Sequence, residues 1–292
     1  DYVNKYNERI HKYGPHLLHC DKNSPALAFL SRFTKWINYV HRVRALLENG
    51  KTTPLPINQT TIEDIFKVKF KDEEQVKRFL ENIRNKNLVP SNTDEFFESK
   101  LGVELTNIFF RPYTRKMWGV DPKKLDLNSG MRLPIRTSKD DSYFNDNFQA
   151  LPLKGYTYLI KNMLDHKNIR VELEKPFSKK MEDDYLHTFL SIPMDNYYSF
   201  KYGELPYRSI LFTNKREKTN QEAVVINFTD DKKYTRKTQW NLLPNSEGFE
   251  NLLNTITYEE PCSMLKNPNE YYYPVQTKNS RKIFEKYKKL SK

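Results

Sequence analysis

Two kinds of side chain that suit a phosphate-bearing ligand gather between positions 113 and 143 of the 292-residue chain. The residues are Tyr113, Trp118, Arg132, Arg136 and Tyr143. An arginine guanidinium presents a fixed fork of donors that matches a phosphate group bidentately. An aromatic ring offers a flat face on which a base or a sugar can stack. The cluster indicates a site for an anionic ligand that contains a ring; the alternative is a surface loop with ordinary basic residues.

Helix breakers limit how this cluster can be built. Pro134 and Pro152 interrupt the stretch, and proline both lacks a backbone donor and clashes with the preceding helical turn. We therefore expect the part that contains the arginines and tyrosines to form strands and turns rather than one long helix.

The motifs around the cluster carry a family resemblance. In chain order, from Tyr113 to Thr157, they read YTRKMWG, MRLPIR, DDSYFND and FQALPLKGYT. They resemble the central motifs of the UDP-galactopyranose mutase family in order and in internal spacing. Other similar stretches are HKYGPHLLH, RFTKWINYVHRVRA, LPIN, KYGELPYRSILF, VVINFTDDKKYTR and NEYYYPV. The resemblance therefore extends from His11 to Leu290.

The resemblance implies an isomerase that interconverts UDP-galactopyranose and UDP-galactofuranose with flavin adenine dinucleotide (FAD) as cofactor. Matched residue by residue, it implies that Arg132 and Arg236 hold the diphosphate of a UDP-sugar. The hydroxyls of Tyr143 and Tyr273 would assist them. Both arginines have an alternative interpretation as plain surface residues, and Tyr273, which precedes Pro274, has one as turn packing.

The same matching implies four further roles. Tyr113 would flank the uracil, Trp118 would lie on a mobile lid, and Arg208 would add a weaker substrate contact. His16 and His19 would lie beside the flavin. Trp118 could instead be a core residue, and the spacing of the histidines could suggest a metal. We do not expect a metal site, because no acid or thiol cluster accompanies the histidines and Pro15 interrupts them.

The glycines bear on the cofactor. No two of the eight are separated by a single residue, whereas a dinucleotide fingerprint needs such glycines where the backbone approaches the pyrophosphate. The family's glycine-rich turn and its final flavin-contacting segment have no counterpart among these 292 residues. Where the family has YTGPID, this chain has SIPMD at 191–195. We therefore expect that these residues alone bind FAD weakly and do not catalyse the reaction.

An alternative function follows from that expectation. A flavin-free, degenerate homologue would act as a binding or structural protein for an anionic partner, either a nucleotide sugar or nucleic acid. The formal charge of +12 favours an anionic partner. A second polypeptide that supplies the missing segments, or a homo-oligomer, is also compatible with the sequence.

The remaining composition points to a reduced, cytoplasmic setting. No run of about 18 apolar residues occurs, so we expect no transmembrane helix, and the first ten residues do not resemble a secretory signal. The two cysteines, Cys20 and Cys262, do not have the spacing of a metal-binding pair.

The hydrophobic patterns predict an α+β fold. We expect an antiparallel sheet domain of about five or six strands, a small helical domain, and a remnant of an α/β (Rossmann-like) flavin-binding domain. The expected helices are 26–33, 61–67, 73–85, 94–118, 156–164 and one after 281; the expected strands are 39–47, 53–57, 170–173, 185–192, 197–212 and 223–228.

The expected domains are discontinuous in the sequence. They are a flavin-domain remnant (1–37 and 150–195), an antiparallel sheet domain (38–60 and 196–260), a helical domain with an active-site lid (61–149), and a C-terminal tail and helix (261–292).

Overall fold

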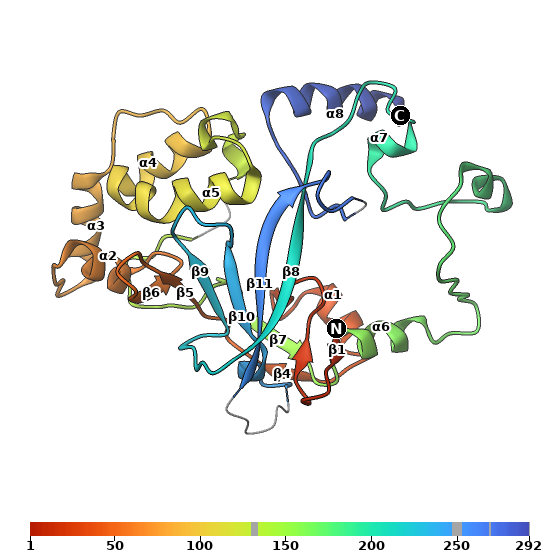
Figure 1. Ribbon diagram of the computed structural model, residues 1–292, viewed down its shortest axis with the longest axis horizontal. Helices are drawn as coiled ribbons and strands as arrows, with labels where there is room; N and C mark the ends of the chain where they lie inside the picture. The colour runs from red at the N-terminus through yellow and green to blue at the C-terminus, as the bar shows by residue number, and fades with distance from the viewer. Residues whose placement is uncertain (130–133, 247–252, 269, 292) are drawn as a thin grey trace.

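A seven-stranded sheet forms the centre of the protein (Figure 1). The structure is a computed structural model that describes residues 1–129, 134–246, 253–268 and 270–291. The strand order is β12-β8-β11-β10-β9-β5-β6, and neighbours are antiparallel except for β5 and β9. The strands are β5 (Val43–Leu46), β6 (Thr52–Leu55), β8 (Tyr207–Glu217), β9 (Val225–Phe228), β10 (Arg236–Gln239), β11 (Asn254–Ser263) and β12 (Tyr273–Pro274).

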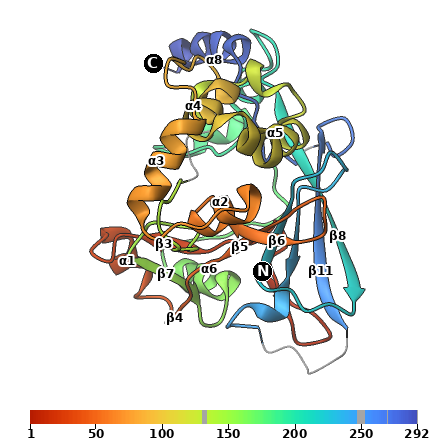
Figure 2. The same cartoon turned by 90° about the vertical axis from the view of Figure 1, so that its left-hand side faces the viewer.

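A smaller three-stranded sheet lies on one side of the large one, below helices α3–α5 in the side view (Figure 2). It has the antiparallel order β3 (Leu18–Cys20), β7 (Phe148–Pro152), β4 (Trp36–Asn38). The short strands β1 (Tyr2–Val3) and β2 (Arg9–Ile10) pair with each other, and helices α1 (Pro25–Leu30) and α6 (Tyr156–Leu164) complete this region.

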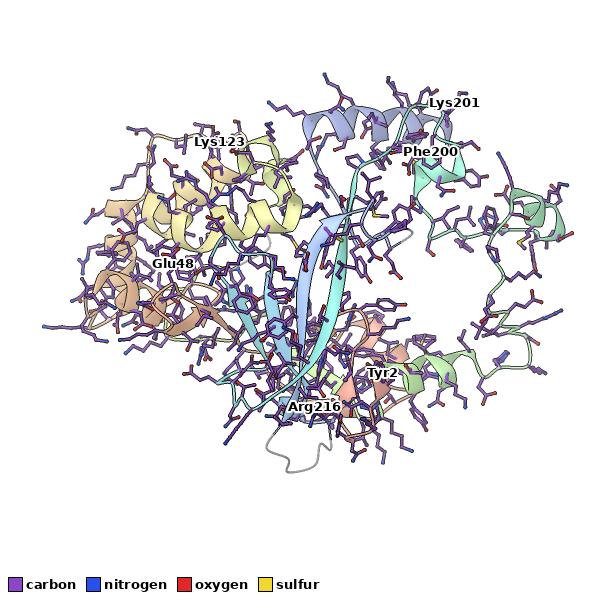
Figure 3. All side chains as sticks on the ribbon, viewed as in Figure 1. Tyr2, Glu48, Lys123, Phe200, Lys201 and Arg216 are labelled. Atoms are coloured by element: carbon purple, nitrogen blue, oxygen red, sulfur yellow. The ribbon has the colours of Figure 1, made fainter. Side chains whose placement is uncertain are left out.

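Ion pairs fasten the N-terminal strands to the large sheet. The carboxylate of Glu8 lies 2.7 Å from a terminal nitrogen of Arg216, near the end of β8 where Tyr2 is also found (Figure 3). The guanidinium of Arg216 also stacks over the ring of Tyr6, 3.8 Å from its centroid. Asp1 accepts hydrogen bonds from the first two backbone N–H groups of α6, which satisfies donors that a helix start otherwise leaves unpaired.

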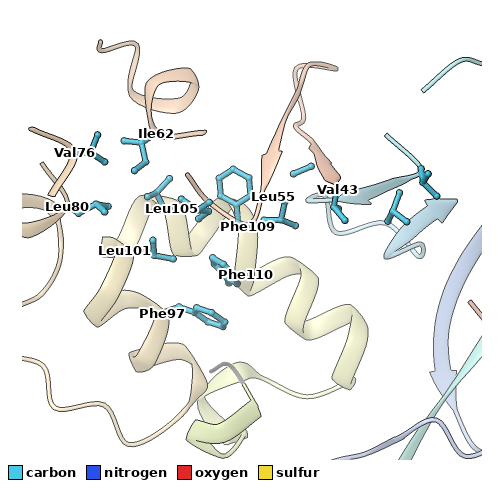
Figure 4. Close-up of a cluster of buried hydrophobic side chains, with 14 of the residues drawn as sticks. Val43, Leu55, Ile62, Val76, Leu80, Phe97, Leu101, Leu105, Phe109 and Phe110 are labelled. Carbon is cyan, nitrogen blue, oxygen red and sulfur yellow. The ribbon is translucent and has the colours of Figure 1, made fainter. Parts of the chain in front are cut away.

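The helices that follow β6 form a bundle whose apolar side chains belong to one core shared with the strands (Figure 4). They are α2 (Gln59–Phe66), α3 (Glu73–Ile83), α4 (Thr93–Leu105), a π-helical turn (Thr106–Phe110) and α5 (Arg111–Trp118). Asn58, Asp72 and Asn92 cap the first three helices through side-chain oxygens. The buried residues include Ile62, Val76, Phe97, Leu101, Leu105 and Phe110.

The single helix expected over 94–118 is wrong in one respect, because this stretch contains three consecutive helical pieces. Gly102 has φ +76° and ψ 173°, a backbone conformation that is essentially restricted to glycine because a Cβ would clash. The π-helical turn that follows shifts the helical register before α5 begins.

The strands expected at 170–173 and 185–192 are also wrong. Both segments are irregular, and neither pairs with any strand in the described ranges. Their apolar side chains project from the side of the molecule (Figure 3), and Leu173 and Phe189 are 84% and 90% exposed. A strand is stabilised by hydrogen bonds to a neighbouring strand, and neither segment has such a neighbour in the described ranges. The expected strand 197–212 begins only at Tyr207, after the short helix α7 (Met194–Tyr197).

The α+β class is confirmed, with a sheet that is larger than expected and contains one parallel pair. The C-terminal helix is α8 (Lys278–Leu290), and the fully buried Tyr287 fastens it by donating to the carbonyl of Gly203 at 2.8 Å. The division into a flavin-domain remnant, a sheet domain and a helical domain stays a prediction.

The backbone at Gly102 gives a stability prediction. A Cβ added there would lie 2.4 Å from the carbonyl oxygen of Ile83, whereas a Cβ at Gly50, with a similar positive φ, would meet nothing within 4 Å. Gly50→Ala should therefore cost only the left-handed backbone term of about 1–2 kcal/mol. Gly102→Ala should cost at least about 3 kcal/mol, because a clash adds to that term. Urea unfolding of both variants measures the difference; equal losses would contradict the packing described here.

Candidate functional site

Three polar side chains lie in one row across the centre of the large sheet. Arg236 on β10 is directly opposite Asn227 on β9 and Glu259 on β11. Residues directly opposite one another on neighbouring strands point to the same face of the sheet. The next member of the row is Phe212 on β8. All three polar residues are thus presented together on one sheet face.

Arg236 and Glu259 form an ion pair with 3.0 Å between Nε and Oε2. Glu259 is only 2% exposed, and burial raises the pKa of its carboxyl group, with the charge of Arg236 opposing that shift. One oxygen, Oε1, is buried and accepts no hydrogen bond from any part of the chain that the structure describes. The pair therefore holds a desolvated carboxylate in the sheet through the charge of a single arginine.

The terminal nitrogens of Arg236 are available to a ligand. About a fifth (21%) of the side chain is exposed, no hydrogen bond to its terminal nitrogens occurs within the described ranges, and Nε is held to Glu259 by charge without a hydrogen bond. A guanidinium that is anchored at Nε and has both terminal nitrogens unused is suited to bind an oxyanion bidentately. Glu259 supplies the anchor.

Three predicted tyrosines from different parts of the chain lie within electrostatic range of Arg236. Tyr113 lies on α5, Tyr143 on the irregular segment 134–147, and Tyr273 on β12. Burial raises the pKa of Tyr113 to about 12 and also raises that of Tyr143, and the positive charge of Arg236 acts on both in the opposite direction. Tyr273 acts electrostatically on the other two tyrosines and on Arg236. The structure thus brings together four of the seven predicted substrate residues.

Hydrogen bonds to β5 and its flanks hold the segment that carries Tyr143. The backbone N–H of Tyr143 donates to the carbonyl of His41 at 2.8 Å. The carboxylate of Asp141 pairs with Arg42 at 2.8 Å and with Arg44 at 3.0 Å.

Arg136 has a structural part in this segment. It donates to Asn145 and to the carbonyl of Phe144, at 2.6 and 3.2 Å, and pairs with Asp140 at 3.3 Å, and so stabilises the loop, while its second terminal nitrogen is buried without a hydrogen-bond partner in the described ranges.

Trp118 and Arg208 lie beside the tyrosines. The rings of Trp118 and Tyr273 are 5.9 Å apart in an edge-to-face arrangement. The guanidinium of Arg208 donates to the carbonyls of Met117 and Lys116 at the end of α5, at 3.1 and 3.2 Å. It also packs on Gly119, where a Cβ would lie 2.8 Å from it. Arg208 thus caps α5 next to the site, and its expected contact with substrate stays a prediction.

The two histidines predicted to lie beside the flavin, His16 and His19, contact different parts of the structure. His16 lies near the ion pair, since its Nδ1 is 2.8 Å from the carbonyl of Gly14 and a Cβ on Gly14 would lie 3.2 Å from Oε1 of Glu259. His19 stacks on Phe144 at 3.6 Å and contacts Asp146 at 2.7 Å. Arg132 lies outside the described residues, so its predicted convergence with Arg236 stays a prediction.

Sequence reasoning missed Asn227, Glu259 and the buried His41. A signal for Glu259 existed in the second half of β11, where the buried Thr257 and Glu259 alternate with the less buried Tyr258 and Glu260. That pattern places Glu259 inward and Glu260 outward, and Glu260 indeed pairs with Lys233 and Lys266. Asn227 and His41 are hydrogen-bonding residues within apolar runs, and such residues are buried only where a partner or ligand exists.

A hollow of about 260 Å³ opens on the same sheet face, next to this row. Its walls include His11, Tyr13, Phe212 and Tyr272. The Nε2 atom of His11 is buried and has no hydrogen-bond partner among the described residues. The described residues contain no group of three or more metal-ligating side chains, and none of their helices is long and apolar enough to cross a membrane.

Comparison with known proteins gives a consistent result. The sequence model of the UDP-galactopyranose mutase family matches residues 108–292. A probable UDP-galactopyranose mutase from Klebsiella pneumoniae is 34% identical over 97% of this chain and 73% of its own length. A dTDP-fucopyranose mutase from Escherichia coli is 30% identical over 99% of this chain and 80% of its own length. The crystal structure of a reduced UDP-galactopyranose mutase superposes with a TM-score of 0.66 at 16% identity, covering 98% of this chain and 76% of that one.

The buried histidines around the site predict a loss of stability in acid. Burial lowers the pKa of His11 and of His41 to about 3, whereas an unfolded histidine titrates near 6.5. Below about pH 6.5 these histidines bind protons in the unfolded chain but stay neutral in the folded chain. The free energy of unfolding therefore falls as the pH drops toward 3. Each histidine contributes a slope of about 1.4 kcal/mol per pH unit.

Denaturant unfolding at several pH values checks this prediction. His41→Gln should reduce the slope of the unfolding free energy against pH by about 1.4 kcal/mol per pH unit between pH 5.5 and 4. The same change at the exposed His187 is the matched control. An unchanged slope in His41→Gln would show that His41 is not held neutral by burial.

Proposed function

Because this chain belongs to the UDP-galactopyranose mutase family, we propose that it binds a UDP-sugar at the Arg236 cluster and interconverts the pyranose and furanose forms when flavin is bound. The observation that carries the proposal is the anchored guanidinium of Arg236 with unused terminal nitrogens and with three tyrosines within electrostatic range. These groups offer the diphosphate one delocalised cation and several hydroxyl donors.

The tyrosines are suited to donate hydrogen bonds to a dianionic leaving group. Because burial raises the pKa of Tyr113 to about 12 and also raises that of Tyr143, both hydroxyls stay protonated at neutral pH. Arg236 would stabilise the negative charge that develops on the diphosphate when the anomeric bond breaks. Glu259 would keep the guanidinium in place without competing for its terminal nitrogens.

The base end of the ligand is proposed to contact α5. Tyr113 and Trp118 both come from this helix, and the Trp118 ring already packs edge-to-face on Tyr273. Aromatic side chains bind a nucleobase by stacking, with a gain of about 1–3 kcal/mol per base. Arg132 would add a second cation to the diphosphate on the strength of the family resemblance.

The hollow beside the ion pair fits a flavin ring. Its walls include the aromatic rings of Tyr13 and Tyr272 and the side chain of His11. When bound, reduced flavin supplies the nucleophile for the anomeric carbon. His11, His16 and the aromatic residues would orient it next to the Arg236 cluster.

The alternative is a flavin-free binding protein for the same ligand. It is favoured by the absence of any pair of glycines one residue apart in the sequence. The two proposals share the UDP site and differ in the cofactor, so they are separated by measuring nucleotide binding and turnover on one preparation.

Nucleotide binding should depend on Arg236. UDP titrated calorimetrically into the chain should bind, and Arg236→Ala should weaken binding about 100-fold, because a charge-assisted bidentate contact contributes about 1.5–3 kcal/mol. Arg32→Ala is the matched control, since this exposed arginine contacts only Phe29 and Phe33. Equal affinity in wild type and Arg236→Ala would overturn the assignment of the site.

Turnover separates the mutase from the binding protein. Conversion of UDP-galactofuranose to UDP-galactopyranose by the chain supplied with FAD and dithionite, measured by chromatography of the nucleotide sugars, would support the mutase and overturn the expectation that these residues alone do not catalyse the reaction. Substantially slower conversion of dTDP-fucofuranose in the same assay would support UDP-galactose as the substrate. UDP binding with no conversion of either sugar would favour the flavin-free alternative.

A further inference from the structure

The side chain of Lys116 joins the helix that carries the proposed base contacts to the hairpin that carries Arg236. It comes from α5 and is only 7% exposed. Its Nζ donates to the carbonyls of Phe228 and Tyr234, at 3.0 and 2.9 Å, and contacts Asp230 at 3.3 Å. Phe228 ends β9, and Tyr234 precedes Arg236 by two residues. In Figure 1 the connection between β9 and β10 reaches up to α5.

This contact uses the full bonding capacity of a lysine. An ammonium group has three donors and no acceptor, and here three oxygens receive them. Burial lowers the pKa of Lys116, while Asp230 acts in the opposite direction. Two of the three acceptors are backbone carbonyls at the end of a hairpin, where no strand partner would otherwise satisfy them.

Arg208 holds the same helix from the other side. Its guanidinium donates to the backbone carbonyls of Lys116 and Met117. Lys116 is therefore fixed at both ends, by β8 through its carbonyl and by the β9–β10 hairpin through its ammonium group. The neighbouring Arg115 makes only an exposed pair with Asp231, at 3.2 Å.

We propose that Lys116 is a positioning residue that sets the distance between the base subsite on α5 and the diphosphate subsite at Arg236. The inference rests on the proposed function. Tyr113 is three residues before Lys116 on the helix, so both side chains lie on the same helical face, and Trp118 follows two residues later. Lys116 and Tyr234 are 118 residues apart in sequence, so a noncovalent contact has to fix the spacing of the two subsites.

A ligand that spans both subsites is sensitive to that spacing, and a ligand that uses only one is not. UDP gains from being held at both ends only if the two subsites have the correct separation, and a misplacement of about 1 Å can cost 100-fold. Uridine engages only the base subsite, and pyrophosphate engages only the arginine. A purely structural role for Lys116 would weaken all three ligands together.

The test compares Lys116→Met with Arg115→Met by calorimetric titration of UDP, uridine and pyrophosphate. Lys116→Met keeps the length of the stem and removes the donors; it should weaken UDP about 10- to 100-fold while uridine and pyrophosphate change less than about threefold. Arg115→Met, which removes an exposed charge from the adjacent position, should leave all three affinities unchanged. Parallel losses for all three ligands, or no loss for UDP, would overturn the proposal.

A milder variant covers the case in which Lys116→Met does not fold. Asp230→Ala removes one of the three acceptors and should weaken UDP by about three- to tenfold with the same selectivity. If wild type itself does not bind UDP, the proposed function fails. If wild type binds UDP and the variants show no selective loss, only the positioning role fails.

Discussion

The ion pair between Arg236 and Glu259 is the interaction on which the site depends. A carboxylate as buried as Glu259 is unstable without a compensating charge, and the cross-strand register of β10 and β11 supplies one directly opposite. The pair holds the guanidinium of Arg236 on this face of the sheet, with about a fifth (21%) of the side chain exposed. Removing either partner would leave an uncompensated buried charge, so the same contact serves the stability of the sheet and the chemistry of its surface.

Everything else at the site is held relative to that pair. The bundle formed by α2–α5 presents Tyr113 and Trp118, and Lys116 and Arg208 fasten α5 to β8, to the end of β9 and to the β9–β10 connection. The segment with Tyr143 is fixed to β5 by Asp141 and its two arginines. Tyr273 is placed by the pairing of β12 with β8. Four separate parts of the chain thus converge through polar contacts that have little freedom to rearrange.

Much of this arrangement could be predicted from the sequence, and the failures have physical reasons. Motif order identified the family and singled out Tyr113, Tyr143, Tyr273 and Arg236, because short motifs with fixed spacing survive where overall identity is low. Local patterns could not reveal that the guanidinium groups of Arg136 and Arg208 donate hydrogen bonds to backbone and side-chain oxygens, since these bonds depend on how the chain folds. The apolar residues at 185–192 favoured a strand that does not form, because a strand exists only beside a partner. Glu259 was missed because burial, rather than residue type, distinguishes it from Glu260.

The most direct test of the central claim, that Arg236 and its three tyrosines form the nucleotide-diphosphate site, is a crystal structure of the chain with UDP. The account predicts diphosphate oxygens within about 3 Å of the terminal nitrogens of Arg236, with the uracil against α5 and Glu259 still paired to Nε. UDP bound elsewhere, for example in the apolar pocket between α8 and β8, with Arg236 making no contact to phosphate, would contradict it.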